Sequence, residues 1–344
     1  MAKRTKRSVR KKGKKANVIL KKKPITLPTI LAVAVGDNDA QHTLQSDPPY
    51  PFVVRPYING LITELKKIGQ IIGKHYQIDY RECPVNDLNN YAFGNFTAAV
   101  AFCMSARVVD HAWSLAHVRP IVGVISDPRN YLNAQRISGY SAQRVQTILA
   151  CYNHFFYSVP SLKTVYVLHD KNHGPSNAAL GTLPGTVKVI HVDSGIPKIP
   201  AELTKVWNHD KPDPHSTGIL VLPVDRCFGD ANDINSWGIS NKVPIFWPVT
   251  DWVFATTTNT QPSALGGYGV SQSYSGEVMG AQVATILQGG TPNPQWIYAN
   301  IDDPAADPDN TDIDWAVSQD AAVKTGTTLV NPPPAGLDVL LPPP

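Results

Sequence analysis

The sequence predicts an α/β protein with two doubly wound lobes, each a parallel sheet covered by helices on both faces. The chain has 344 residues, which is enough for two domains of ordinary size, and 42% of them are hydrophobic, as in globular proteins. Short apolar runs that end in Gly, Asp or Ser alternate with segments of helical periodicity, and this alternation comes in two series. Strands that alternate with helices form parallel sheets through right-handed crossovers.

The first series of strands and helices runs from residue 29 to about residue 156. Its apolar or alternating runs predict four strands, at 29–37, 75–83, 97–105 and 120–128. Between the first two, apolar residues recur at helical spacing from Ile58 to Ile72. A helix that ends near His117 and a longer one that carries Val145 to Phe156 complete the series.

The second series begins after Pro160 and contains four more predicted strands, at 163–170, 187–194, 218–225 and 243–251. A helix rich in Gly and Ala is expected between the first two, and another helix from about Asp230. The C-terminal segment is less regular. Residues 331–344 are expected to form an extended, Pro-rich tail.

Positive charge is concentrated at the start of the chain. The formal net charge is +4, but residues 1–23 hold 12 Lys or Arg and no acidic residue, which leaves −8 on the remainder. We therefore expect residues 1–26 to form a basic, disordered tail. Such a tail either solubilises the protein or contacts an anionic partner, and nucleic acid would be a partner only through it.

Several classes of function have no signature in the sequence. GxSxG, HExxH, P-loop and helix-opening GxGxxG motifs are all missing, so no catalytic residue, cofactor or enzyme activity is predicted. The four cysteines form no CxxC pair, and His169 and His173 have no third ligand at a clear spacing, so no metal site is predicted. No run of about 18 apolar residues indicates a transmembrane segment, and the basic tail lacks the apolar core of a secretory signal.

Small polar or acidic residues follow nearly every predicted strand, and each is explained equally well as a helix N-cap. Open α/β sheets, however, bind ligands outside the carboxyl ends of their strands. Gathered at one cleft, carboxylates, hydroxyls and helix N-termini would suit a zwitterion. Trp252, Tyr268 and Trp247 would add a flat apolar wall, although packing is as good an explanation for them. The candidate ligand contacts are Asp37, Asn38, Ser105, Asp127, His169, Asp225, Thr250, Asp251, Trp252 and Tyr268.

Six motifs, in order along the chain, resemble the substrate-binding proteins of ABC transporters with the type I periplasmic-binding fold. The similarity is to the group in which some members bind aromatic amino acids. The motifs are "PIVGVISDP" (120–128), "RISGYS" (136–141), "KTVYVLHDKNHGPS" (163–176), "LPVD" (222–225), "LGGYGVSQSYSGEVMGAQVATILQG" (265–289) and "DIDWAVSQDAAVKTGTTLVNPPP" (312–334). Ser271 and Gln272 depart from the family pattern, which has an Asp and an aromatic residue there.

The resemblance implies two lobes joined by a hinge of three crossing strands. The N-terminal lobe would comprise 27–158 with 249–290, and the C-terminal lobe 159–248 with 291–330. The implied function is solute binding for an ABC-type transport system, with a small ligand such as an amino acid between the lobes and Asp225 as the ligand-facing acid. ABC permease subunits would be the partners, in the periplasm or cell envelope. The alternative is a cytoplasmic sensor or regulator with the same fold, if Met1 is the true start.

Overall fold

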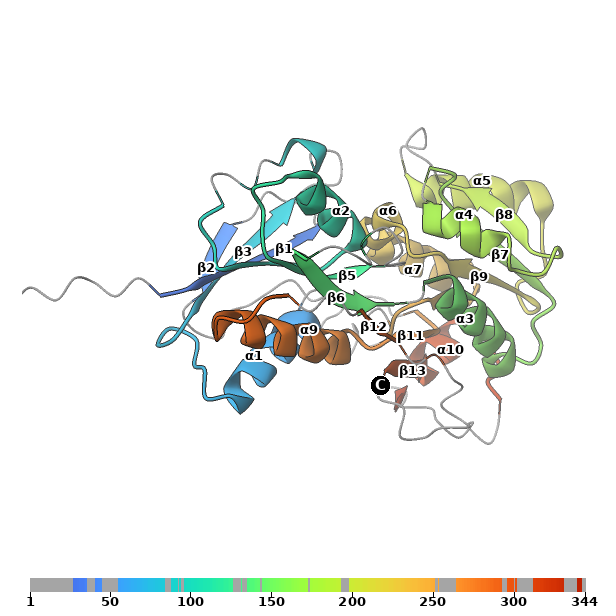
Figure 1. The fold of residues 1–344 in the computed structure, drawn as a ribbon. Helices are drawn as coiled ribbons and strands as arrows, with labels where there is room; N and C mark the ends of the chain where they lie inside the picture. The colour runs from blue at the N-terminus through green and yellow to red at the C-terminus, as the bar shows by residue number, and fades with distance from the viewer. Residues whose placement is uncertain are drawn as a thin grey trace, which may run out of the picture.

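The chain forms two lobes, which lie side by side in the computed structural model (Figure 1). The structure describes residues 27–35, 41–44, 55–83, 88–91, 93, 96–125, 131, 135–142, 144–172, 174–192, 198–250, 253, 264–292, 296–299, 301, 312–330 and 339–341. Over these residues, each lobe contains one seven-stranded sheet. The α/β architecture with two lobes that the sequence predicts is confirmed.

The first sheet has the strand order β12-β6-β5-β4-β1-β3-β2. All neighbouring strands are parallel except β2, which runs antiparallel to β3 at the edge. The central strands β1, β4 and β5 are buried on both faces, which is why they appear in the sequence as continuous apolar runs. The strands are β1 Thr29–Val35, β2 Gln41–Leu44, β3 Gln77–Cys83, β4 Val100–Cys103, β5 Ile121–Ile125, β6 Ile137–Ser141 and β12 Ile297–Tyr298.

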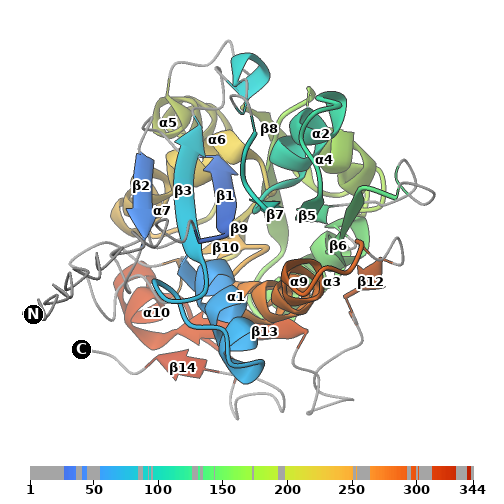
Figure 2. The same ribbon diagram turned by 60° about the vertical axis from the view of Figure 1, so that its left-hand side comes forward.

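Helices cover both faces of the first sheet. One hydrophobic cluster joins Leu61 of α1 (Arg55–Lys67) and Met279 of α9 (Gln272–Leu287) to one face, and these two helices lie side by side (Figure 2). A second cluster joins Val109 of α2 (Ala106–Ser114) to the other face. Alternate residues of β1 belong to different clusters, as expected for a strand with a core on each side. A 3₁₀ turn, η1 (Leu88–Asn90), packs beside α2.

The second sheet has the strand order β14-β13-β11-β10-β9-β7-β8. Its neighbouring strands are parallel except β11 and β13, which are antiparallel. The four strands predicted in the second series are all present, as β7, β8, β9 and β10. The strands are β7 Thr164–His169, β8 Lys188–His191, β9 Thr217–Val221, β10 Ile245–Trp247, β11 Gly266–Val270, β13 Ile313–Ser318 and β14 Val339–Leu341.

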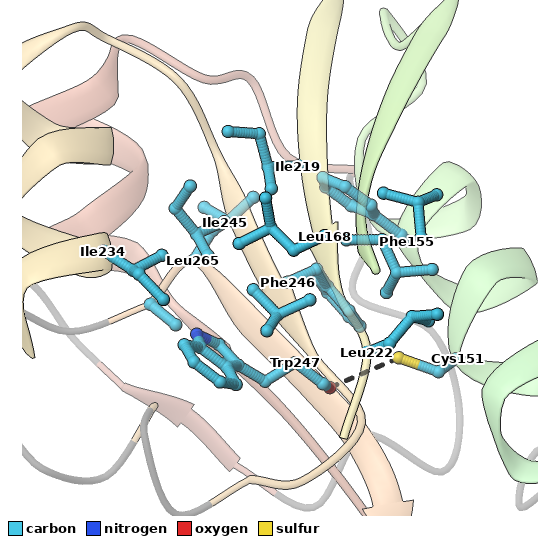
Figure 3. Packing of buried hydrophobic residues seen from close by; sticks show 14 of the residues in the cluster. Cys151, Phe155, Leu168, Ile219, Leu222, Ile234, Ile245, Phe246, Trp247 and Leu265 are labelled. Atoms are coloured by element: carbon cyan, nitrogen blue, oxygen red, sulfur yellow. Dashed lines mark hydrogen bonds between the residues drawn. The ribbon is translucent and has the colours of Figure 1, made fainter. Parts of the chain in front are cut away.

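The helices of the second lobe form two groups. α3 (Arg144–Ser158) packs against α4 (Gly174–Leu180) and β11. α7 (Ala231–Ser240) packs against α5 (Ile199–Asp210), α6 (Asp225–Gly229) and α10 (Gln319–Thr325). In the core, Phe155 of α3 stacks on Phe246, and the thiol of Cys151 donates to the carbonyl of Trp247 at 3.2 Å (Figure 3).

Three segments belong to the other lobe than the one expected. α3 lies within the range 27–158 expected for the first lobe, but its apolar side chains belong to the core of the second, and β11 likewise lies in the second sheet. Conversely, β12 lies within 291–330 but pairs with β6 of the first sheet. The reason is that an apolar pattern reports burial and does not report which sheet provides the partner surface.

Part of the expected Pro-rich tail, 331–344, belongs to the second sheet. The apolar triplet Val339–Leu341 forms β14, which runs parallel to β13. The expected basic tail, 1–26, lies outside the described residues. No helix in the described part of the chain has both the length and the apolar composition needed to cross a membrane.

Candidate functional site

The chain crosses between the lobes at the carboxyl ends of strands. β6 ends at Ser141, and α3 of the other lobe follows; β11 ends at Val270, and α9 of the first lobe follows. The third crossing lies between Ala299, whose N–H donates to the Ser141 carbonyl at 2.9 Å, and Ile313, the register partner of Val270. Val270 and Ile301 contact the core clusters of both lobes. The carboxyl edges of both sheets therefore lie on the side of the hinge.

The strand order identifies one position on each edge as the expected ligand position. In a doubly wound sheet, the ligand binds where neighbouring strands lead to helices on opposite faces. The order β3-β1-β4-β5-β6 places this switch point between β1 and β4 in the first sheet. The equivalent order β8-β7-β9-β10-β11 places it between β7 and β9 in the second. The candidate site is thus the pair of switch points beside the hinge.

Ser105 lies at the switch point of the first lobe, directly after β4 and Met104. It is the N-cap of α2, and its half-buried Oγ accepts the Val108 N–H at 3.3 Å. The capping role expected as the alternative is therefore present. Asp37 and Asn38 come after β1 in the sequence, and Asp127 comes after β5; these three lie outside the described residues and stay predictions as ligand contacts.

His169 is the last residue of β7 and lies at the switch point of the second lobe, only 2% exposed. Its Nε2 lies 2.7 Å from Oδ1 of Asn177, and its Nδ1 lies 3.4 Å from Nδ1 of His191. Both ring nitrogens thus face groups of their own lobe. In this arrangement the imidazole offers no nitrogen to the first lobe.

Asp225 follows β9 on the other side of the same switch point, as the first residue of α6. Val224 is the N-cap residue of this helix and makes no side-chain capping hydrogen bond. The capping position that we considered for Asp225 is therefore occupied by its neighbour. The contact between the Asp225 carboxylate and a ligand stays a prediction.

Thr250, after β10, is 5% exposed, and its carbonyl accepts the Val253 N–H at 2.8 Å. Glycine in β11 leaves room for the chain that follows β10, because a Cβ atom on Gly267 would collide with the Val249 carbonyl. The chain after β10 can therefore lie directly against β11, near the crossing at Val270. Asp251 and Trp252 come next and lie outside the described residues.

Tyr268 has a packing role in this structure. It lies in the middle of β11, is fully buried, and stacks on the His154 ring of α3 with centroids 3.9 Å apart. Trp247 is also fully buried and donates its indole N–H to Asn235 at 3.0 Å. Of the two explanations considered for the aromatic residues, the structure favours packing for these two.

Two polar residues on the carboxyl edge of the first sheet were missed by the sequence analysis. Ser141, at the end of β6, is 1% exposed, and its Oγ has no hydrogen-bond partner among the described residues. Glu82, near the end of β3, is 7% exposed and accepts the Tyr80 hydroxyl at 2.6 Å. Both lie inside strands, whereas most of the predicted contacts follow strands. A polar residue among the last two residues of a strand is the pattern that indicates them.

Asp312 links the crossings through a buried hydrogen-bond network. The Tyr140 hydroxyl of β6 donates to its carboxylate at 3.2 Å, and its backbone carbonyl accepts the Ser271 N–H at 2.8 Å. Burial, together with the negative charge of Asp312, raises the pKa values of Tyr140 and Tyr274, so both phenols are neutral donors. The network joins residues of both lobes at the hinge, and no local pattern in the sequence indicates it.

The comparisons with known proteins identify the fold. No family model and no curated protein matches the chain. A conserved domain protein from Vibrio cholerae matches with TM-score 0.66 and 16% identity, over 89% of this chain and 96% of the other. An ABC domain from Streptococcus pneumoniae in complex with L-Trp matches with TM-score 0.62 and 14% identity, over 88% and 96%.

A third similar structure is the ligand-free, open form of a substrate-binding protein with adhesive properties from Clostridium difficile. It has a TM-score of 0.53 and 16% identity, and the match covers 92% of this chain and 100% of the other. At such identities the likeness concerns the fold. The two lobes, their doubly wound sheets and these neighbours together show that the chain has the two-lobed, type I periplasmic-binding fold that these solved structures share.

Proposed function

We propose that this protein is a solute-binding protein of an ABC-type transport system that closes its two lobes over a small ligand. The observation that carries the proposal is the position of the crossings. The described strand ends that flank the three crossings lie at the carboxyl edges of the two sheets, where doubly wound sheets bind ligands. A hinge at that edge changes the separation of the two switch points, so a ligand that contacts both favours the closed state.

The best candidate ligand is an amino acid or a related zwitterion. Asp225 at the switch point of the second lobe would pair with an ammonium group, and N–H groups at helix N-termini favour a carboxylate. The L-Trp bound to the similar Streptococcus pneumoniae domain supports this class of ligand. The substrate-binding proteins among the structural neighbours support two further parts of the proposal, permease subunits as partners and a periplasmic or cell-envelope location.

A ligand screen tests the proposal directly. Thermal-shift assays with amino acids, sugars and small carboxylates should identify a ligand class, and calorimetry should give one site per chain. At about 100 times Kd, one ligand stabilises the folded state by about 2.7 kcal/mol, so Tm should rise by several degrees. Small-angle scattering should then report a smaller radius of gyration at saturation.

Three outcomes would count against the proposal. A ligand that saturates the protein without changing its scattering profile would exclude closure. Turnover of a bound compound would indicate an enzyme. Location of the native protein in the cytoplasm by cell fractionation would favour the alternative, a ligand sensor or regulator with the same fold that uses its basic tail to contact an anionic partner.

A further inference from the structure

Two histidines lie together at the carboxyl ends of neighbouring strands in the second sheet. His169 ends β7 and His191 ends β8, and the two are register partners in this parallel pair. Register partners project from the same face of a sheet, so their side chains are adjacent. His169 is almost fully buried, and His191 is exposed at the edge of the sheet. His169 was one of the candidate solute contacts, but both of its ring nitrogens face groups of its own lobe, and His191 was not among the candidates.

The neighbours of His169 determine its tautomer. The side-chain amide of Asn177 donates from Nδ2 to the Lys171 carbonyl at 2.6 Å, which leaves its Oδ1 to face His169. Because Oδ1 only accepts, Nε2 of His169 must carry the hydrogen of this 2.7 Å bond. In the neutral ring, Nδ1 is therefore unprotonated, and this is the nitrogen that faces His191.

The distance between the two facing nitrogens fits shared metal ligation better than a direct hydrogen bond. The Nδ1 atoms are 3.4 Å apart, and the rings meet edge to face at 70°. Hydrogen bonds from a nitrogen donor usually span about 2.7–3.2 Å. Two imidazole nitrogens bound tetrahedrally to one zinc ion, with bonds of about 2.0–2.1 Å, lie about 3.3–3.4 Å apart.

We propose that His169 and His191 form a binding site for one divalent transition-metal ion through their Nδ1 atoms. Asn177 acts as the outer partner that fixes the ring of His169, as carbonyl and carboxylate groups do for histidine ligands in known metal sites. The described residues contain no group of three or more His, Cys, Asp or Glu side chains placed to hold a metal, so we assign two protein ligands to the site. The exposure of His191 leaves room for water beside them.

Imidazole ligands select the kind of ion. Neutral histidine nitrogens suit Cu²⁺, Ni²⁺ and Zn²⁺, whereas Mg²⁺ and Ca²⁺ prefer oxygen ligands. The general order of stability places Cu²⁺ first among these ions. The site therefore binds Cu²⁺ most tightly and Zn²⁺ or Ni²⁺ less tightly, and it does not bind Mg²⁺.

Calorimetric titration of the full chain with CuSO₄, ZnCl₂ and MgCl₂ in a non-coordinating buffer tests the proposal. One Cu²⁺ and one Zn²⁺ should bind per chain, with no response to Mg²⁺. His191→Ala should weaken Cu²⁺ binding at least about tenfold, and Asn177→Leu should weaken it about 10- to 100-fold by releasing the His169 ring. The electron paramagnetic resonance spectrum of bound Cu²⁺ should show nitrogen coupling that His191→Ala reduces.

His209→Ala is the matched control, because His209 is also exposed and lies in the same lobe, in α5. Its Cu²⁺ affinity should equal that of the parent. All three substituted residues are exposed, so the variants should fold, which the unfolding curve without metal checks. The proposal is overturned if the parent does not bind Cu²⁺, if His191→Ala binds it as tightly as the parent, or if Asn177→Leu leaves the affinity unchanged.

Discussion

Tyr76 carries a hydroxyl group that the fold buries without a hydrogen-bond partner in the described part of the chain. A buried, unsatisfied hydroxyl destabilises the folded state, so Tyr76→Phe should raise the free energy of unfolding by about 1 kcal/mol at pH 7. Tyr166→Phe is the control. That hydroxyl donates to Asp210 at 2.5 Å, so its removal should lower the free energy of unfolding. Urea unfolding measures both, and a loss of stability in Tyr76→Phe would contradict the prediction.

The same hydroxyl predicts a dependence of stability on alkaline pH. Burial raises the pKa of Tyr76 from 10.0 to about 12. Between these values the unfolded chain releases the phenol proton and the folded chain retains it. The folded state then binds more protons, so the free energy of unfolding must fall as pH rises from 10 to 12. The slope in this interval should be smaller for Tyr76→Phe than for the parent.

For Asp225, the sequence alone could not distinguish a helix N-cap from a carboxylate that contacts the ligand. The structure gives the N-cap position of α6 to Val224, so Asp225→Asn should change Tm little. If the carboxylate pairs with a ligand ammonium, the same change should weaken binding by about 2–5 kcal/mol, the usual effect of unpairing a buried charge. Calorimetry with the ligand identified by the screen checks this. Equal affinity in both proteins would remove Asp225 from the site.

At the scale of elements, α1 and α9 pack closely because both contain glycine at their contact. A Cβ atom on Gly276 of α9 would collide with the Tyr57 carbonyl of α1, and one on Gly60 would lie 2.6 Å from the Glu277 nitrogen. Such spacing excludes any side chain at these positions. α9 follows the second crossing, and α1 precedes β3 in the chain. Packed against each other, the two helices cover one face of the first sheet.

Gly276→Ala should therefore have the opposite sign from its effect in a free helix. In an exposed helix the change stabilises by about 0.5–1 kcal/mol, but here overpacking should lower the free energy of unfolding by about 1–3 kcal/mol. Gly174→Ala, at the start of α4, is the control, because a Cβ atom there would have no atom within 4 Å. Equal effects of the two substitutions would show that the contact between α1 and α9 is not tight.

At the scale of the whole molecule, the hinge is held by contacts between residues far apart in the chain. Asp312 stands before the antiparallel strand β13 of the second lobe, and its partners Tyr140 and Tyr274 belong to the first. A carboxylate that accepts two phenols within a buried network stabilises more than either bond alone. The relative position of the lobes thus depends on a polar network as well as on apolar packing.

Asp312→Ala should lower the free energy of unfolding by about 1–3 kcal/mol, because it leaves the buried Tyr140 hydroxyl without its acceptor. Tyr140→Phe should cost less, since the carboxylate keeps Tyr274. The double variant should lose less than the sum of the single variants, with a coupling of about 0.5–3 kcal/mol. Guanidinium unfolding of the four proteins measures this coupling, and additivity within about 0.5 kcal/mol would exclude the network.

The sequence by itself determined the fold class and most of the strands. Continuous apolar runs such as 29–37 and 163–170 arise because central parallel strands are buried on both faces, and this burial is visible without a structure. Ser105 and His169 were also expected at the ends of strands, and they lie after β4 and at the end of β7, because a strand's end is marked locally by the change from apolar to polar residues. Only the strand order shows that both of these ends lie at switch points.

Only the tertiary structure decided which lobe holds α3, β11 and β12, and which polar groups meet at the hinge. Residues 140, 271 and 312 approach one another only after the chain has crossed between the lobes three times. Likewise, the alignment of His169 with His191 depends on the register of β7 and β8. Local patterns report burial and backbone preference, whereas contacts between distant segments depend on the packing of the whole chain, which no local pattern contains.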